Sequence, residues 1–246
     1  MVEMNHVVNT DAFELLKNID DASIDLLFLD PDYQDWNDLI EQGIINESIR
    51  CLKDTGNILC FTKQPFDYEL RIAVNDYFRR EIYWTFENGG AWVSKKMPLV
   101  SCQKIYWLVK TFDFFFNPRT GLPYNEKTRD FKRNAKVFRG YNEEGRNFSM
   151  SDDGTWLRDH LHFNKPCMGG IPAKPKELVN IFVNCFCPID GVVCDPFSGS
   201  GIIPMTALKT GRKFVASEKN EARANDINKS LKEATWQTTI FDFLEA

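Results

Sequence analysis

Short apolar runs alternate with longer amphipathic segments in two parts of the chain, one before residue 112 and one after residue 170. This alternation is typical of parallel strands joined by crossover helices. We therefore expect an α/β fold, with strands at Ile24–Leu29, Asn57–Phe61, Glu81–Phe86, Lys104–Lys110, Val192–Cys194, Lys213–Ser217 and Thr238–Phe243. The expected helices are Asp38–Leu52 with Gly56 as its stop, Phe66–Phe78, one that begins at Pro175, Gly201–Lys209 and Ala222–Ala234.

The composition is that of an ordinary enzyme of 246 residues with a net charge of −5. Seven irregularly spaced cysteines favour reduced thiols over disulfides. Three histidines and the lack of a Cys-x-x-Cys pair argue against a metal site. The first residues do not resemble a signal peptide, and no apolar run reaches 18 residues, so we expect a cytoplasmic protein with no membrane partner.

The segment between Phe112 and Gly170 has no periodicity and is too long for an ordinary connection. Between Arg119 and Arg146 it holds eight Lys or Arg residues against four Asp or Glu residues, with aromatic residues interleaved. Such a basic patch in an acidic chain suits phosphate binding, and a solvated loop is the alternative. No helix-turn-helix or other reader of known geometry is visible in it.

A glycine-containing turn follows the predicted strand that ends at Cys194 and runs from Asp195 to Gly201. Glycines there let the backbone approach a ligand, and Glu218, which closes the next strand, is placed to hold ribose hydroxyls. Because Pro204 replaces the third glycine of a dinucleotide loop, a nucleoside without pyrophosphate fits better. The turn points toward S-adenosylmethionine, whereas a tight turn without a ligand is the simpler alternative.

A second polar turn, Asp30-Pro31-Asp32-Tyr33, follows the apolar strand Ile24–Leu29. By itself an Asp-Pro turn is ordinary. Its position is more informative, because ligands of parallel sheets collect beyond the carboxyl ends of the strands.

The Asp-Pro-x-Tyr turn comes first in the chain and the glycine-containing turn second. This order resembles the beta class of DNA amino-methyltransferases, in which the catalytic tetrapeptide precedes the cofactor loop. The Asp-Pro-x-Tyr turn takes the place of the catalytic tetrapeptide, Lys174-Pro175 that of the helix start, and Phe197-x-Gly199-x-Gly201 that of the cofactor loop. The resemblance implies a Rossmann-like methyltransferase fold with a mostly parallel seven-stranded type of sheet, helices on both faces and circularly permuted motifs. It divides the chain into a catalytic half (1–111), an inserted target-recognition region (112–170) and a cofactor-binding half (171–246).

The resemblance also implies roles for individual residues. The Asp30 carboxylate and the Pro31 carbonyl would accept the hydrogens of a base amino group, and Tyr33 would stack on the extruded base. A core position is the alternative for Tyr33. S-adenosylmethionine would be held by Asp30, Lys174, Asp195, Phe197, Ser198, Gly199, Ser200, Gly201 and Glu218.

Two of these residues carry alternatives. Lys174 could meet the donor's carboxylate or be solvated. Asp32 stands where the family has a second proline, and its carboxylate could orient the amine, face water, or mark a chain without turnover.

Double-stranded DNA is the implied partner, and a homodimer is a further expectation from the family. We predict phosphate contacts from Lys95, Lys96, Arg129, Lys132 and Arg133. Asp30 as the leading residue favours N6 of adenine. The alternatives are N4 of cytosine, an RNA or protein methyltransferase, and a noncatalytic DNA-binding module with a degenerate cofactor pocket.

Overall fold

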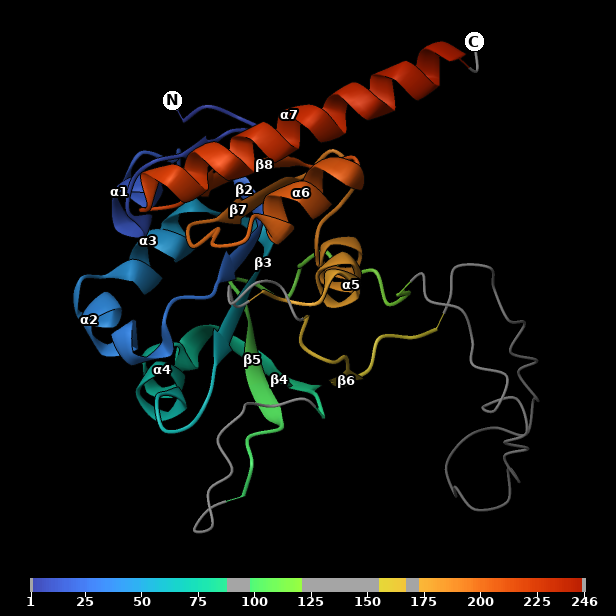
Figure 1. Ribbon diagram of the computed structural model, residues 1–246. Coiled ribbons are helices and arrows are strands. Elements are labelled where there is room, and N and C mark those ends of the chain that lie inside the picture. Colours follow the sequence, from blue (N-terminus) through green and yellow to red (C-terminus); the bar gives the residue numbers. More distant parts are fainter. Residues whose placement is uncertain (1, 88–97, 121–154, 167–172, 245–246) are drawn as a thin grey trace, which may run out of the picture.

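The computed structural model describes residues 2–87, 98–120, 155–166 and 173–244 (Figure 1). Its strands are β1 (Val7–Val8), β2 (Ile24–Leu29), β3 (Leu52–Thr62), β4 (Phe78–Thr85), β5 (Cys102–Val109), β6 (His160–His162), β7 (Val192–Asp195) and β8 (Lys213–Ser217). Its helices are α1 (Ala12–Lys17), α2 (Trp36–Glu41), α3 (Ile44–Cys51), α4 (Asp67–Ala73), α5 (Lys176–Phe186), α6 (Ile202–Lys209) and α7 (Glu221–Leu244). Two 3₁₀ turns, η1 (Tyr33–Asp35) and η2 (Asn75–Tyr77), complete the elements.

The strands form one sheet in the order β1-β8-β7-β2-β3-β5-β4-β6. All neighbouring pairs are parallel except those that β5 makes with β3 and β4. Strand β2 therefore lies in the middle of the sheet, between β7 from the far end of the chain and β3. The mostly parallel sheet of the prediction is confirmed, and β1 and β6 are added to the predicted strands.

Helices cover both faces of the sheet, as the sequence predicts (Figure 1). One buried cluster joins the sheet to α1, α2, α3 and α4, and the other joins it to α5, α6 and α7. The side chains of β2 serve both clusters: Phe28 faces the α5 side and Leu29 the α3 side. A strand with all six residues buried is what a central parallel position requires.

The predicted helix Asp38–Leu52 is two helices, because Gly43 adopts φ +90° and starts α3 anew. Gly56 is not its stop but lies inside β3, where a Cβ would come within 2.7 Å of the Leu52 side chain. The close packing at that point therefore explains the glycine. The predicted helix Phe66–Phe78 is shortened to α4 and followed by η2.

The predicted final strand Thr238–Phe243 is wrong, because these residues continue α7. The place next to β8 is taken by β1. Asn228 of α7 then accepts from the Val7 N–H and donates to the Val7 carbonyl, both at 2.9 Å. Since these bonds occupy the outer edge of β1 at Val7, a further strand has no partner groups there.

The cysteines and the helices bear on two further expectations. All six cysteines in the described part of the chain are free thiols. In the same part, no helix is both long and apolar enough to cross a membrane. The domain division stays a prediction, and most of its central region lies outside the described residues.

Candidate functional site

Both turns singled out by the sequence lie at one edge of the sheet. Strand β2 pairs in parallel with β7, with Leu27 opposite Cys194. Asp30 follows β2 directly, and Asp195 is the last residue of β7. Figure 1 shows the two strands side by side in the sheet. Parallel neighbours end at the same edge, where α/β proteins bind their ligands. The structure therefore brings together two motifs that are 165 residues apart in the sequence.

The Asp30 carboxylate is held by two side chains. One oxygen accepts from the Lys174 ammonium at 2.5 Å and the other from the Tyr33 hydroxyl at 3.3 Å. The side chains of Lys174 and Asp30 are only 13% and 20% exposed, so the structure does not leave Lys174 in open solvent. Burial, and then the charge of Asp30, raises the pKa of Tyr33, so its hydroxyl stays protonated as a donor.

Asp32 keeps the backbone shape of the proline that it replaces. Its φ of −59° lies within the range that a proline ring imposes. Its carbonyl accepts from the Asp35 N–H at 2.8 Å and so starts η1. The side chain is exposed, and no described residue bonds to its carboxylate. The Asp32 carboxylate thus faces solvent in the structure, and its role in the reaction stays a prediction.

The glycine turn after β7 is fixed to the end of β8. The Ser198 N–H donates to the Ser217 carbonyl at 3.0 Å, and the Gly199 N–H donates to the Glu218 carboxylate at 3.0 Å. Gly199 and Gly201 have φ values of +48° and +74°, which disfavour any side chain. Phe197 is half-buried and Ser200 is exposed beside them. The predicted ribose acid, Glu218, therefore lies against the predicted cofactor loop.

Asp195 carries a buried carboxyl oxygen without a partner. One oxygen accepts weakly from the Phe197 N–H at 3.3 Å, whereas Oδ2 is buried and forms no hydrogen bond with any residue that the structure describes. Burial, and then the negative charge of Asp30, raises the pKa of Asp195 to about 8. A buried acceptor that lacks a donor is costly. A cationic ligand group such as an ammonium would supply the missing donor, so these residues fit S-adenosylmethionine.

Two lysines that the sequence reading missed lie at the same edge. Lys63 follows β3, with its ammonium 5.4 Å from the centre of the Tyr33 ring. Lys165 lies beyond β6, with its ammonium 4.0 Å from the centre of the Phe86 ring. The position of Lys63, two residues after the predicted strand Asn57–Phe61, was an available signal. Nothing in the sequence pattern marks Lys165.

The predicted phosphate contacts Lys95, Lys96, Arg129, Lys132 and Arg133 lie outside the described residues.

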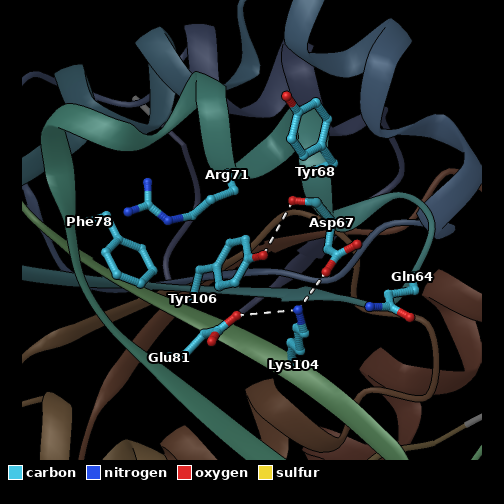
Figure 2. Close-up of a pocket in the computed structure, with 8 residues that line it drawn as sticks. All are labelled: Gln64, Asp67, Tyr68, Arg71, Phe78, Glu81, Lys104 and Tyr106. Carbon is cyan, nitrogen blue, oxygen red and sulfur yellow. Dashed lines mark hydrogen bonds and ion pairs between the residues drawn. The ribbon is translucent and has the colours of Figure 1, made fainter.

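A cavity of about 540 Å³ lies on the α4 side of the sheet (Figure 2). Lys104 crosses it to form ion pairs with Asp67 at 2.6 Å and Glu81 at 3.5 Å. Tyr106 donates to the Asp67 carbonyl at 3.3 Å. None of the predicted site residues lines this cavity, and its central cation already has two carboxylate partners. It is therefore not the candidate site.

Comparison with known proteins identifies the family. Residues 13–229 match the N6/N4 methyltransferase family model, which is described as DNA methylase. A curated relative, the Type II methyltransferase M1.MboII of Moraxella bovis, is 22% identical over 93% of this chain and 96% of its own length.

Solved structures share the fold. The M1.HpyAVI–SAM complex has a TM-score of 0.65 at 19% identity and covers 92% of this chain and 98% of its own. The cytosine-N4-specific PvuII DNA methyltransferase has a TM-score of 0.64 at 15% identity and covers 92% of this chain and 93% of its own. The Rossmann-like methyltransferase fold is thereby confirmed.

The family match covers most of the chain, and it includes both turns at the edge of the sheet. It confirms the prediction that S-adenosylmethionine is the cofactor. The chain belongs to the N6/N4 family of DNA methyltransferases.

Proposed function

We propose that this chain transfers a methyl group from S-adenosylmethionine to N6 of adenine in double-stranded DNA, after the base has left the helix. The observation that carries this proposal is the placement of Asp30 and Asp195 at the ends of paired strands. A base amine at Asp30 would then be next to a donor at the glycine turn. The leading aspartate of the catalytic turn supports adenine as the target.

The chemistry rests on positioning. An exocyclic amine is a poor nucleophile because its lone pair is delocalised into the ring. Acceptance of its hydrogens by the Asp30 carboxylate and the Pro31 carbonyl would direct the lone pair toward the methyl group. Tyr33, whose hydroxyl bonds to Asp30, would stack on the base. The donor needs no further activation, since it carries a positive sulfonium.

The proposed donor contacts follow from the described groups. Asp195 has the unpartnered oxygen for the ammonium, and Glu218 has acceptor capacity beyond its two backbone contacts for ribose hydroxyls. Lys174, next to Asp30, is placed for the donor's carboxylate.

Donor binding should release a proton at pH 7. Because the folded-state pKa of Asp195 is about 8, its carboxyl is mostly protonated at neutral pH, whereas an ammonium partner favours the ionised form. We expect release of nearly one proton at pH 7 and less as the pH rises through 8, where Asp195 is ionised before the donor binds. Calorimetry in buffers of different ionisation enthalpy measures this quantity. Asp195→Asn is the control that should release none, and a wild-type protein that releases no proton at pH 7 would contradict the contact.

Asp32→Pro should retain activity and raise stability. The residue already has the φ of proline, and no described residue accepts from its N–H, so the ring removes freedom only from the unfolded chain. The expected gain is about 0.4–1 kcal/mol. Thermal melting and labelled methyl transfer to DNA check it. A variant that loses transfer would show that the Asp32 carboxylate itself takes part in the reaction.

The identity of the methylated nucleoside tests the proposed substrate. DNA lacking methylation is incubated with the protein and the donor, digested to nucleosides and analysed by mass spectrometry. N6-methyladenine is the expected product. N4-methylcytosine would refute the adenine assignment, and transfer to RNA alone would refute DNA as the substrate. Binding of DNA without any transfer would favour the noncatalytic module.

A further inference from the structure

Three lysine ammoniums lie along a continuous set of contacts around the catalytic turn. Lys63 lies over the Tyr33 ring, and Tyr33 bonds to Asp30. Asp30 pairs with Lys174, whose ammonium is 5.8 Å from the centre of the Trp84 ring. The contacts continue from Trp84 to Phe86, with ring centres 5.3 Å apart, and from Phe86 to Lys165. We call Lys63, Lys165 and Lys174 the lysine triad.

The backbone holds these lysines in place. Lys63 is the first residue after β3. The segment before Lys165 is fixed to the end of β4, because the Phe163 N–H donates to the Thr85 carbonyl at 3.0 Å and Asn164 accepts from the Glu87 N–H at 2.9 Å. Both lysines therefore start from the edge of the sheet at which β2 ends, rather than from a distant surface.

The charges of Lys63 and Lys174 act on Lys165. The pKa of Lys165 is lowered by burial first and then by the positive charges of Lys174 and Lys63. Asp30 pairs with Lys174, and a further anion beside Lys63 and Lys165 would reduce the remaining repulsion among the three ammoniums. In a chain with a net charge of −5, such local clusters must supply the attraction for a polyanion.

The strand order indicates which anion each lysine can reach, the carboxylate of the methyl donor or a phosphate of the DNA. The glycine turn follows β7, on the side of β2 that leads to β8. Lys63 and Lys165 lie on the other side, after β3 and β6. Lys174 is at Asp30 and so is near enough to serve the donor's carboxylate. The other two lysines are placed away from the donor loop, on the side of Asp30 that leads to β3 and β6.

We propose that Lys63 and Lys165 bind the backbone phosphates next to the extruded nucleotide. The inference rests on the proposed function, because it assumes a base at Asp30. An ammonium is a compact charge that suits a phosphate oxygen, and contacts of this kind position the strand without reading its sequence. Each of the two ammoniums lies over an aromatic ring, Tyr33 for Lys63 and Phe86 for Lys165, and these contacts keep the charges at the edge of the sheet.

The test uses Lys63→Met and Lys165→Met, which keep the stem and remove the charge. Affinity for a duplex that the wild-type protein methylates is measured by fluorescence anisotropy at several salt concentrations. Each variant should bind about tenfold more weakly at low salt, because a hydrogen bond to a charged group is lost. Each should also lower the slope of log affinity against log salt by about one. Arginine at either position should restore both.

Controls separate this role from others. Lys209→Met removes an exposed lysine at the far end of α6 and should change neither quantity. Thermal melting of Lys165→Met shows whether the variant is folded, so that weaker DNA binding is not a result of unfolding. Unchanged salt slopes, or weaker binding of S-adenosylmethionine in place of weaker DNA binding, would overturn the proposal. A wild-type protein that methylates no DNA would instead refute the proposed function.

Discussion

Replacement of Asp30 by alanine is expected to lower methyl transfer to DNA about a thousandfold, while the affinity for S-adenosylmethionine changes little. A rate loss of this size is expected when a group that orients and polarises the reacting amine is removed from a partly desolvated site. The variant also removes the partners of Lys174 and Tyr33, so folding is checked by thermal melting. Single-turnover transfer and donor calorimetry measure the two effects separately.

Two further variants test whether the loss of methyl transfer is specific to removal of the Asp30 carboxylate. Asp54→Ala removes an exposed aspartate whose ion pair with Lys110 is 3.7 Å long and should leave transfer unchanged. Asp30→Ala combined with Lys174→Met removes the lysine that the single variant leaves without its counter-charge. We expect no recovery in the double variant. Recovery would show that the freed lysine, rather than the missing carboxylate, had blocked the reaction, and wild-type transfer by Asp30→Ala would refute the assignment outright.

Gly201→Ala is expected to destabilise the protein by about 2–4 kcal/mol, through left-handed backbone strain and a steric clash. A Cβ at this position would come within 2.7 Å of the Ile227 side chain, and φ is +74°. For a chain of this size the change corresponds to a fall of roughly 10 °C in melting temperature. Donor binding should weaken as well, because Gly201 ends the turn that Glu218 holds at Gly199.

Gly211 provides the matched control. It has nearly the same φ, +72°, but no atom lies within 4 Å of where its Cβ would be. Gly211→Ala should therefore show the backbone strain alone, about 1–2 kcal/mol, with donor binding intact. A smaller residue at position 227 should recover part of the loss in Gly201→Ala. Equal stability of the two glycine variants would mean that Ile227 moves aside.

The sequence predicted the centre of the fold well. Strands β2 and β8 have the predicted bounds, since an apolar run that ends in a polar turn is a local signal. The sequence also predicted that Asp30 and Asp195 would share an edge, because parallel strands impose it. Propensity failed at the end of the chain, where Thr238–Phe243 has a strand-like composition but belongs to α7. Strand β1 already pairs with β8, so a strand from the end of the chain has no place there.

The sequence did not predict which distant residues pair with one another in the folded chain. The ion pair between Asp30 and Lys174 joins residues 144 positions apart. Lys165 reaches the site only because the short strand β6 pairs with β4, and three residues are too few to give a periodic pattern. A count of basic residues drew attention to 119–146 instead. That segment lies mostly outside the described residues, and its role in phosphate binding stays a prediction.

The pairing of β2 with β7 has a consequence for biosynthesis. During translation, β2 is made long before the strand that covers one of its two sides. Until Val192–Asp195 leaves the ribosome, that side exposes unpaired backbone groups flanked by apolar side chains. A nascent or truncated chain that stops short of β7 thus combines an incomplete site with a surface prone to aggregation.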